Sequence, residues 1–125
     1  MNASKIFVSN RTKGKADELK HLFNDLIVLD WGALVDFDII INATSMGMVG
    51  QPAFSQPISR AKKTALVVDI VYNPLVTDLL KEAQKLNLKT VGGIGMLINQ
   101  AVPGFEHWFQ KTPVIEDDIR KFIIE

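Results

Sequence analysis

The sequence contains no cysteine, carries no net charge, and has no apolar run long enough to cross a bilayer. Without cysteine, a disulfide framework and a thiolate metal site are both excluded. The 14 basic residues are balanced by 14 acidic ones, so the composition does not favour a nucleic-acid coat or a polybasic membrane patch. A membrane-spanning helix would need about 20 consecutive apolar residues, and we expect none.

The sequence also shows no signal peptide in its first residues and no metal-binding pattern around its histidines. Met1 to Ser4 has neither the charged nor the apolar region of a signal peptide, so we expect a cytoplasmic protein. His21 and His107 have no second histidine or matching carboxylate nearby in the sequence, so no metal site is expected. The 125 residues, 47% of them hydrophobic, suit one globular domain with a core.

What the sequence does contain is an alternation of short apolar strands and amphipathic helices. The expected strands cover residues 6–8, 26–29, 37–41, 65–71 and 88–91. The expected helices cover residues 13–24, 77–86, 96–109 and 115–123. This alternation predicts an α/β fold with a parallel sheet wrapped by helices. The run 37–41, in which Asp38 is the one polar residue, predicts a strand that is covered on both faces.

A basic turn follows the first strand and contains Asn10, Arg11, Thr12, Lys13 and Lys15. Ligands of parallel α/β sheets bind outside the carboxyl ends of the strands. An NAD site usually has an acid at this place, whereas this chain has Arg11. A guanidinium can pair bidentately with a 2′-phosphate, and the Thr12 hydroxyl and the helix N-terminus add donors for the same anion. Taken alone, the segment favours a solvated basic turn in which Thr12 caps the helix.

Three further segments follow strands, and each alone also fits an ordinary turn. Residues 42–48 form a loop of small polar side chains, and residues 69–74 place Tyr72 at the end of a strand. Residues 92–100 begin with glycines but do not fit G-x-G-x-x-G, because Ile98 stands where the last glycine belongs. What remains is a tight turn, followed on the helix by Gln100.

Together, the four segments resemble the nucleotide-binding domain of the shikimate dehydrogenase family. The matching stretches are NRT at 10–12, IINATSMGM at 40–48, DIVYNP at 69–74, GIGMLINQ at 93–100 and FEHW at 105–108. The resemblance runs from about residue 5 to the C-terminus. It implies a Rossmann-like parallel sheet with helices on both faces. It also implies NADP as the cofactor and the NADPH-dependent reduction of 3-dehydroshikimate to shikimate, a step of aromatic amino-acid biosynthesis.

The resemblance also implies roles for individual residues. Contacts to the adenosine 2′-phosphate fall to Asn10, Arg11 and Thr12, extended by Lys13 and Lys15. Contacts on the nicotinamide side fall to Thr44, Ser45, Ile70 and the Gly93 backbone. Contacts to the substrate fall to Tyr72 and Gln100. Ile70 replaces a residue that is often methionine, and Pro103-Gly104 replaces smaller residues that are usual in this family.

Other parts of the family pattern have no counterpart here, so no catalytic residue is assigned. Nothing resembles the N-terminal substrate domain with its Lys and Asp pair, nor the first strand and glycine-rich pyrophosphate loop. That strand is central in a sheet of order 3-2-1-4-5-6. Its absence predicts unpaired strand edges, unless the two neighbouring strands meet directly or a second copy of the chain covers them.

Three hypotheses follow from the sequence. The chain is an incomplete shikimate dehydrogenase that cannot turn over 3-dehydroshikimate alone, a binding module for NADP without chemistry, or an assembly protein. Whether the parent enzyme acts on shikimate or on quinate stays open, because that choice rests on the substrate domain. Neither nucleic acid nor membrane is expected as a partner.

Overall fold

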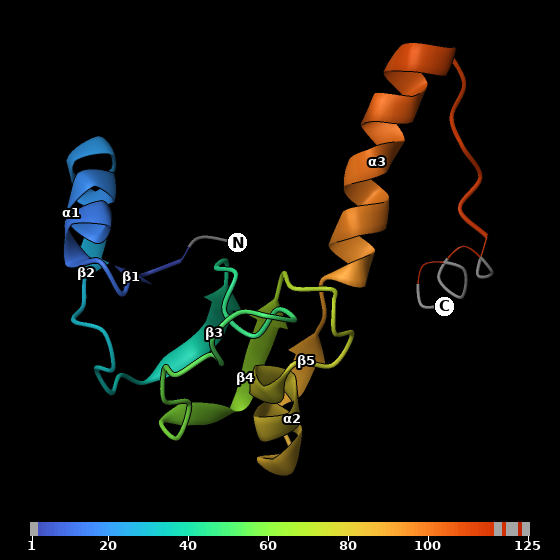
Figure 1. Cartoon of the computed structure of the whole chain (residues 1–125). Coiled ribbons are helices and arrows are strands. Elements are labelled where there is room, and N and C mark those ends of the chain that lie inside the picture. Colours follow the sequence, from blue (N-terminus) through green and yellow to red (C-terminus); the bar gives the residue numbers. More distant parts are fainter. Residues whose placement is uncertain (1–2, 117–118, 120–122, 124–125) are drawn as a thin grey trace. The chain divides into compact units, whose positions relative to one another are not determined.

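The computed structural model of this chain describes residues 3–116 together with Ile119 and Ile123. The elements follow one another as β1 (Ile6–Val8), α1 (Lys13–Leu22), β2 (Leu26–Val28), β3 (Phe37–Asn42), β4 (Ala61–Asp69), α2 (Asp78–Lys85), β5 (Lys89–Val91) and α3 (Ile94–Phe109) (Figure 1). Most of the helix expected over 115–123 lies outside the described residues. No helix in the described part of the chain is both long and apolar enough to pass through a membrane.

The chain divides into two compact units, each with its own parallel sheet. The first unit contains Met1–Val35 and Ser55–Arg60, and the second contains Asp36–Phe54 and Ala61–Glu125. Strands β1 and β2 pair in the first unit, whereas the second has the order β3-β4-β5. Every strand pair is parallel, which confirms the predicted fold class of a parallel α/β protein.

The first unit has a small core. Helix α1 packs on β2, and Ala16 is its one buried residue. The segment 55–60 completes this core with Ile58, which is fully buried. Gln56 ties that segment down, because its amide donates to the Ser9 hydroxyl at 2.8 Å and accepts from the Gly32 backbone N–H at 2.7 Å. The carboxyl end of β1 is therefore held in place by a segment distant in sequence.

The second unit has a larger core around β4. Ala65 and Val67 are buried at alternate positions of this strand, as expected where side chains point to opposite faces in turn. Helix α2 packs on β4 and β5 with three buried residues, namely Leu79, Leu80 and Ala83. The β4 strand begins four residues earlier than the sequence pattern predicted and ends at Asp69, so residues 70–74 of the candidate segment 69–74 are loop and not strand.

The prediction that residues 37–41 form a fully covered strand is wrong. Ile39 and Ile41 are 53% and 59% exposed. They lie two positions apart and so share one face of β3. Among the described strands, β3 pairs with β4 alone and forms the edge of its sheet. A run of isoleucines that resembles a covered central strand is therefore an edge strand with one exposed apolar face.

Helix α3 begins two residues earlier than predicted and continues through Pro103 to Phe109. Proline lacks the N–H that would bond one turn back, so it normally kinks or breaks a helix interior. The Asn99 side-chain amide donates to the Gly95 carbonyl at 2.7 Å, one turn before that point. Helix α3 starts directly after Gly93, its N-cap residue, and Pro103 lies inside it.

Candidate functional site

The basic turn at the end of β1 is exposed and leaves donor groups free. Within the described residues, the Arg11 guanidinium makes no hydrogen bond or ion pair. Thr12 stands at the N-cap position of α1, but its side chain makes no capping bond. The expected N-cap residue is thus confirmed in position, but the Lys15 N–H donates to the Thr12 backbone carbonyl at 3.0 Å and not to its hydroxyl. The Asn10 side-chain oxygen accepts from the Thr12 backbone N–H at 2.9 Å. The Thr12 hydroxyl stays available to a ligand.

Lys13 differs from its neighbours because it already has an acidic partner. Its Nζ lies 2.6 Å from a carboxylate oxygen of Asp30, which follows β2. The hydrogen bond to Asp30, then the charge of that carboxylate, raise the pKa of Lys13 above its ordinary value of 10.5. Asp30 was not among the expected site residues. Its sequence signal was an acid directly after a strand that neighbours β1.

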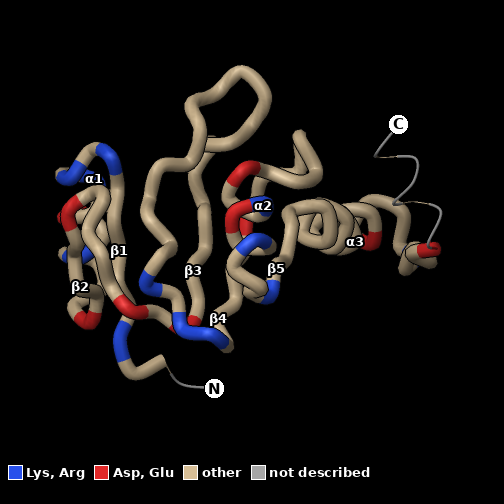
Figure 2. The backbone as a smooth tube through the Cα atoms, turned by 90° about the horizontal axis from the view of Figure 1, so that it is seen from below, with Lys and Arg blue, Asp and Glu red and all other residues tan. Residues whose placement is uncertain are grey.

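This edge of the first unit fits a phosphate dianion. Basic positions gather where β1 leads into α1 (Figure 2). Arg11 and Lys15 are exposed and have no ion pair within the described range, while the Thr12 hydroxyl is free of the cap. An anion placed here would meet a guanidinium, a hydroxyl and the positive end of a helix dipole. The residues present therefore suit the 2′-phosphate of an adenosine nucleotide.

In the second unit, the segments after β3, β4 and β5 meet at one edge. The Ile70 N–H donates to the Asn42 carbonyl at 3.1 Å, and the Val49 N–H donates to the Asn73 carbonyl at the same distance. The Gly93 N–H donates to the Val71 carbonyl at 3.3 Å. The three segments indicated by the sequence are thus brought together by backbone hydrogen bonds.

Gly93 has a strict steric reason for being glycine. A Cβ atom at this position would overlap the Ile70 carbonyl oxygen and lie 2.5 Å from its carbon and 2.8 Å from the Val71 carbonyl carbon. No side chain fits between α3 and the end of β4. The start of α3 therefore lies directly against the backbone that follows β4, where a flat ligand could also approach closely.

The remaining expected residues of this edge differ in how available they are. The Thr44 hydroxyl is used inside its loop, since it donates to the Asn42 side-chain oxygen at 2.7 Å and accepts from the Met46 N–H at 3.1 Å. Ser45 and Tyr72 are exposed, and Ile70 is half-buried. Gln100 is exposed on α3, beyond the turn itself. Ser45 and Tyr72 are therefore the hydroxyl groups that this edge offers to a ligand.

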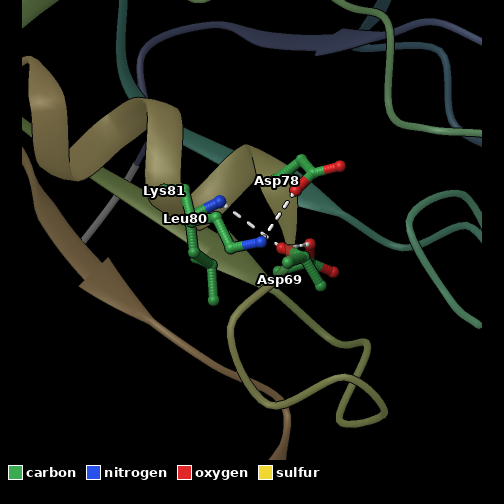
Figure 3. A network of polar contacts seen from close by, with 5 residues as sticks. Asp69, Asp78, Leu80 and Lys81 are labelled. Carbon is green, nitrogen blue, oxygen red and sulfur yellow. Dashed lines mark hydrogen bonds and ion pairs between the residues drawn. The ribbon is translucent and has the colours of Figure 1, made fainter.

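Behind this edge lies a buried polar network that the sequence did not reveal as a unit. Asn42, Asp69 and Thr77 are 1%, 0% and 0% exposed. Asp69 accepts from the Asn42 amide at 3.0 Å and from the Thr77 hydroxyl at 2.6 Å. Figure 3 shows Asp69 next to the first turn of α2. The available signal was a polar residue at the end of each of two apolar strands, Asn42 and Asp69, which are register partners.

Metal chemistry has no visible support in this arrangement. Across residues 3–116, 119 and 123, no group of three or more histidines and acids is placed to hold a metal ion. The ligand donors at the two edges are guanidinium, ammonium, hydroxyl and backbone groups. These donors suit the phosphate and the rings of a nucleotide.

Parallel strands whose carboxyl ends carry these donors define a Rossmann-like nucleotide-binding fold. The chain is a relative of the NADP⁺ shikimate dehydrogenases, with 43% identity over 124 residues to the enzyme of Jannaschia sp. (strain CCS1), a match that covers 95% of this chain and 45% of that one. No family model matches the chain. The resemblance indicated by the four motifs is thereby confirmed.

Solved structures agree with this assignment. A shikimate dehydrogenase in complex with NADP⁺ has a TM-score of 0.76 and 36% identity over 96% of this chain and 45% of that one. The quinate dehydrogenase of Corynebacterium glutamicum in complex with NAD has a TM-score of 0.78 and 28% identity over 96% of this chain and 46% of that one. The chain thus spans slightly less than half the length of these relatives.

Proposed function

We propose that this chain is the nucleotide-binding part of a shikimate dehydrogenase and that it binds NADP(H). One observation carries the proposal: Arg11, at the carboxyl end of β1, has a guanidinium without a partner among the described residues. It stands where an NAD site has an acid. The exposed Lys15 ammonium and the free Thr12 hydroxyl support the same ligand, the adenosine 2′-phosphate.

The second unit would hold the nicotinamide end, with Ser45, Ile70 and the Gly93 backbone beside it. Bound NADPH would supply the hydride for reduction of a carbonyl substrate. The chain's own residues bind and orient: Thr44 shapes its loop through two internal hydrogen bonds, and the tight Gly93 turn keeps side chains away from the ring. Tyr72 and Gln100, both exposed, would reach the substrate.

Calorimetry with NADPH, NADH and 2′,5′-ADP tests the proposal. We expect NADPH and 2′,5′-ADP to bind and NADH to bind more weakly, because only the first two carry the 2′-phosphate. Arg11→Gln should weaken both phosphate ligands by roughly 10- to 100-fold, since hydrogen bonds to charged groups contribute about 1.5–3 kcal/mol.

The control for this experiment is Lys63→Gln, which removes the same charge from an exposed position on β4 and should leave both affinities unchanged. Equal affinities for NADPH and NADH, or no binding of either, would refute the proposal. A similar loss in both variants would show that net charge, and not the Arg11 site, governs binding.

The reaction of the whole enzyme follows from its relatives and is proposed as the reduction of 3-dehydroshikimate to shikimate. We expect no turnover from this chain alone, because the Lys and Asp pair that the resemblance implies for proton transfer belongs to a substrate domain that none of the matching motifs covers. The exposed Lys13–Asp30 pair lies instead at the phosphate edge. Turnover of 3-dehydroshikimate at enzymatic rates would contradict this expectation. Quinate is the alternative substrate class, and a preference for NADH over NADPH would favour it, since one quinate relative is solved with NAD. A cytoplasmic location remains a prediction from composition.

A second candidate function is assembly, and the exposed edge of β3 favours it. Ile39 and Ile41 expose more than half of their surface on an edge strand, and such edges pair readily with other chains. Light scattering over a range of concentrations should then show association in the wild type and less in the Ile39→Thr/Ile41→Thr variant. Leu34→Thr removes an equally exposed apolar group from the first unit and serves as the control. A monomer at high concentration would exclude this function.

A further inference from the structure

Three polar side chains are fully buried behind the edge formed by β3, β4 and β5. Asn42 ends β3, Asp69 ends β4, and Thr77 is the N-cap of α2. Polar groups of this kind are rarely removed from water unless each has hydrogen-bond partners. Within the described residues, no buried side-chain nitrogen or oxygen lacks one. The network is therefore complete, and its geometry can be traced bond by bond.

Each member of the network bonds to the backbone of a different segment. The Asn42 side-chain oxygen accepts from the Thr44 N–H at 3.1 Å, and its amide donates to the Met46 carbonyl at 3.0 Å. Asp69 accepts from the Val71 N–H at 3.0 Å. The Thr77 hydroxyl accepts from the N–H of Leu80 in α2 at 3.4 Å. The network thus determines the course of the loop after β3, the segment after β4 and the start of α2.

Asp69 joins these three parts into one. Its Oδ1 accepts from Asn42 and Val71, and its Oδ2 accepts from Thr77. The Asn42 and Thr44 side chains bond to the backbone of residues 44 and 46, and Ser45 lies between these two positions. Tyr72 follows Val71 directly. The exposed hydroxyl groups of this edge are therefore one residue away from atoms that the network holds.

We propose that Asn42, Asp69 and Thr77 act as one positioning unit for the nicotinamide side of the site. On the proposed function, which this inference presupposes, the network holds residues 44–46 and 70–72 in the conformation that receives the nicotinamide half of NADP(H). Loss of one member loosens both segments together and weakens the binding of the nicotinamide half. The adenosine half, which depends on the exposed donors around Arg11, is unaffected.

Hydrogen exchange of the full chain tests the coupling without any ligand. Thr77→Val keeps the shape of the side chain and removes the hydroxyl, while Thr77→Ser keeps the hydroxyl. In Thr77→Val we expect the Thr44, Met46 and Val71 amides to exchange about tenfold faster than in the wild type, the change that a loss of about 1.4 kcal/mol produces. The Val67 and Val68 amides of β4 should change less, and Thr77→Ser should restore the wild-type pattern.

A uniform rise across the second unit, or no rise at Thr44 and Met46, would overturn the proposal, because the network would then serve stability alone. The Leu80 amide is left out of the comparison, since it loses its own acceptor in Thr77→Val. Asp69→Asn is the second variant if Thr77→Val does not fold. It keeps the shape of the side chain, but its amide nitrogen donates where a carboxylate oxygen accepted.

Calorimetry then separates this inference from the proposed function. We expect Thr77→Val to bind NADPH several-fold more weakly and 2′,5′-ADP as the wild type does, whereas Arg11→Gln weakens both ligands. Unchanged NADPH binding in Thr77→Val, or an equal loss for both ligands, would overturn the positioning role. If the wild type binds neither ligand, the proposed function fails, and the exchange pattern alone then decides whether the three side chains act as one unit.

Discussion

The two sheet edges of this chain differ in the groups that they offer to a ligand. The edge after β1 and β2 offers exposed charged groups, of which only Lys13 is paired with a described acid, Asp30. The edge after β3, β4 and β5 offers few free groups but rests on a buried network of hydrogen bonds around Asp69. The first arrangement suits a phosphate dianion, and the second suits a flat ring that needs a fixed backbone.

The difference shows what each kind of site requires of the fold. Charge acts over a Debye length of about 10 Å, so the exposed Arg11 and Lys15 side chains can attract an anion without being held in one exact position. The van der Waals attraction between a ring and the backbone, in contrast, weakens markedly when the two separate by a fraction of an ångström. The backbone around Ile70 and Gly93 must therefore be held rigidly. Mutations at the second edge should accordingly act through the stability and conformation of the backbone, whereas mutations at the first edge should change affinity directly.

The largest effect is expected from Gly93→Ala in the second unit. Its Cβ would lie 2.5 Å from the Ile70 carbonyl carbon, and backbone atoms cannot yield as a flexible side chain can. We expect the free energy of unfolding to fall by about 3 kcal/mol or more, at the upper end of overpacking costs. Denaturant unfolding followed by circular dichroism measures this.

Gly95→Ala is the matched control two residues along α3, where a Cβ would meet nothing within 4 Å. Because alanine favours helix over glycine, this variant should be unchanged or up to about 1 kcal/mol more stable. If Gly93→Ala were as stable as Gly95→Ala, this result would contradict the close approach of α3 to the backbone at the end of β4. The contrast between a rigid edge and a charged edge would then lose its structural basis.

The sequence predicted the strands and helices better than the interactions between them. Periodicity locates both α1 and α2, and in α2 the apolar stripe is the buried face, with Leu79, Leu80 and Ala83. In α1 the same pattern locates the helix, but only Ala16 is buried. Periodicity could not show that Ile39 and Ile41 are exposed, because an apolar edge strand and a covered one have the same composition. Burial of a strand depends on its neighbours in the sheet, which local pattern does not contain.

In the candidate site, too, the sequence predicted individual residues better than the interactions between them. Arg11 taken alone favoured a solvated turn, and its assignment to the 2′-phosphate came from the resemblance and stays a prediction. The structure places Arg11 in the turn between β1 and α1, as expected. The Lys13–Asp30 pair and the link between Asn42 and Asp69 join residues 17 and 27 positions apart. Such bonds depend on strand register and loop course, so only the three-dimensional structure reveals that Asp69 connects the motifs that the sequence treated separately.

A smaller effect, on affinity, is expected from Asp30→Asn in the first unit. The change removes a negative charge from the phosphate edge and frees Lys13 for the ligand. Because an exposed ion pair contributes little, we expect 2′,5′-ADP to bind only roughly two- to fivefold more tightly. Asp38→Asn is the control, since Asp38 pairs with Lys62 at 2.8 Å in the second unit. Weaker binding in Asp30→Asn would mean that Asp30 itself holds the ligand.

The smallest effect is the pH dependence of the Lys13–Asp30 pair. Its hydrogen bond and charge raise the folded-state pKa of Lys13 above the ordinary 10.5, so the stabilisation is fully present below pH 10.5 and is lost as the pH rises through the raised value. The effect is small because both side chains are well exposed, at 63% and 76%. The difference in unfolding free energy between the wild type and Asp30→Asn should therefore be constant from neutral pH up to 10.5 and shrink above it.

The control is the difference in unfolding free energy between Gly93→Ala and Gly95→Ala, which involves no titrating group and should not change over the same range. A wild-type advantage over Asp30→Asn that persists after Lys13 loses its proton would show that Asp30 stabilises the first unit by another contact, and its effect on 2′,5′-ADP could then not be assigned to the release of Lys13.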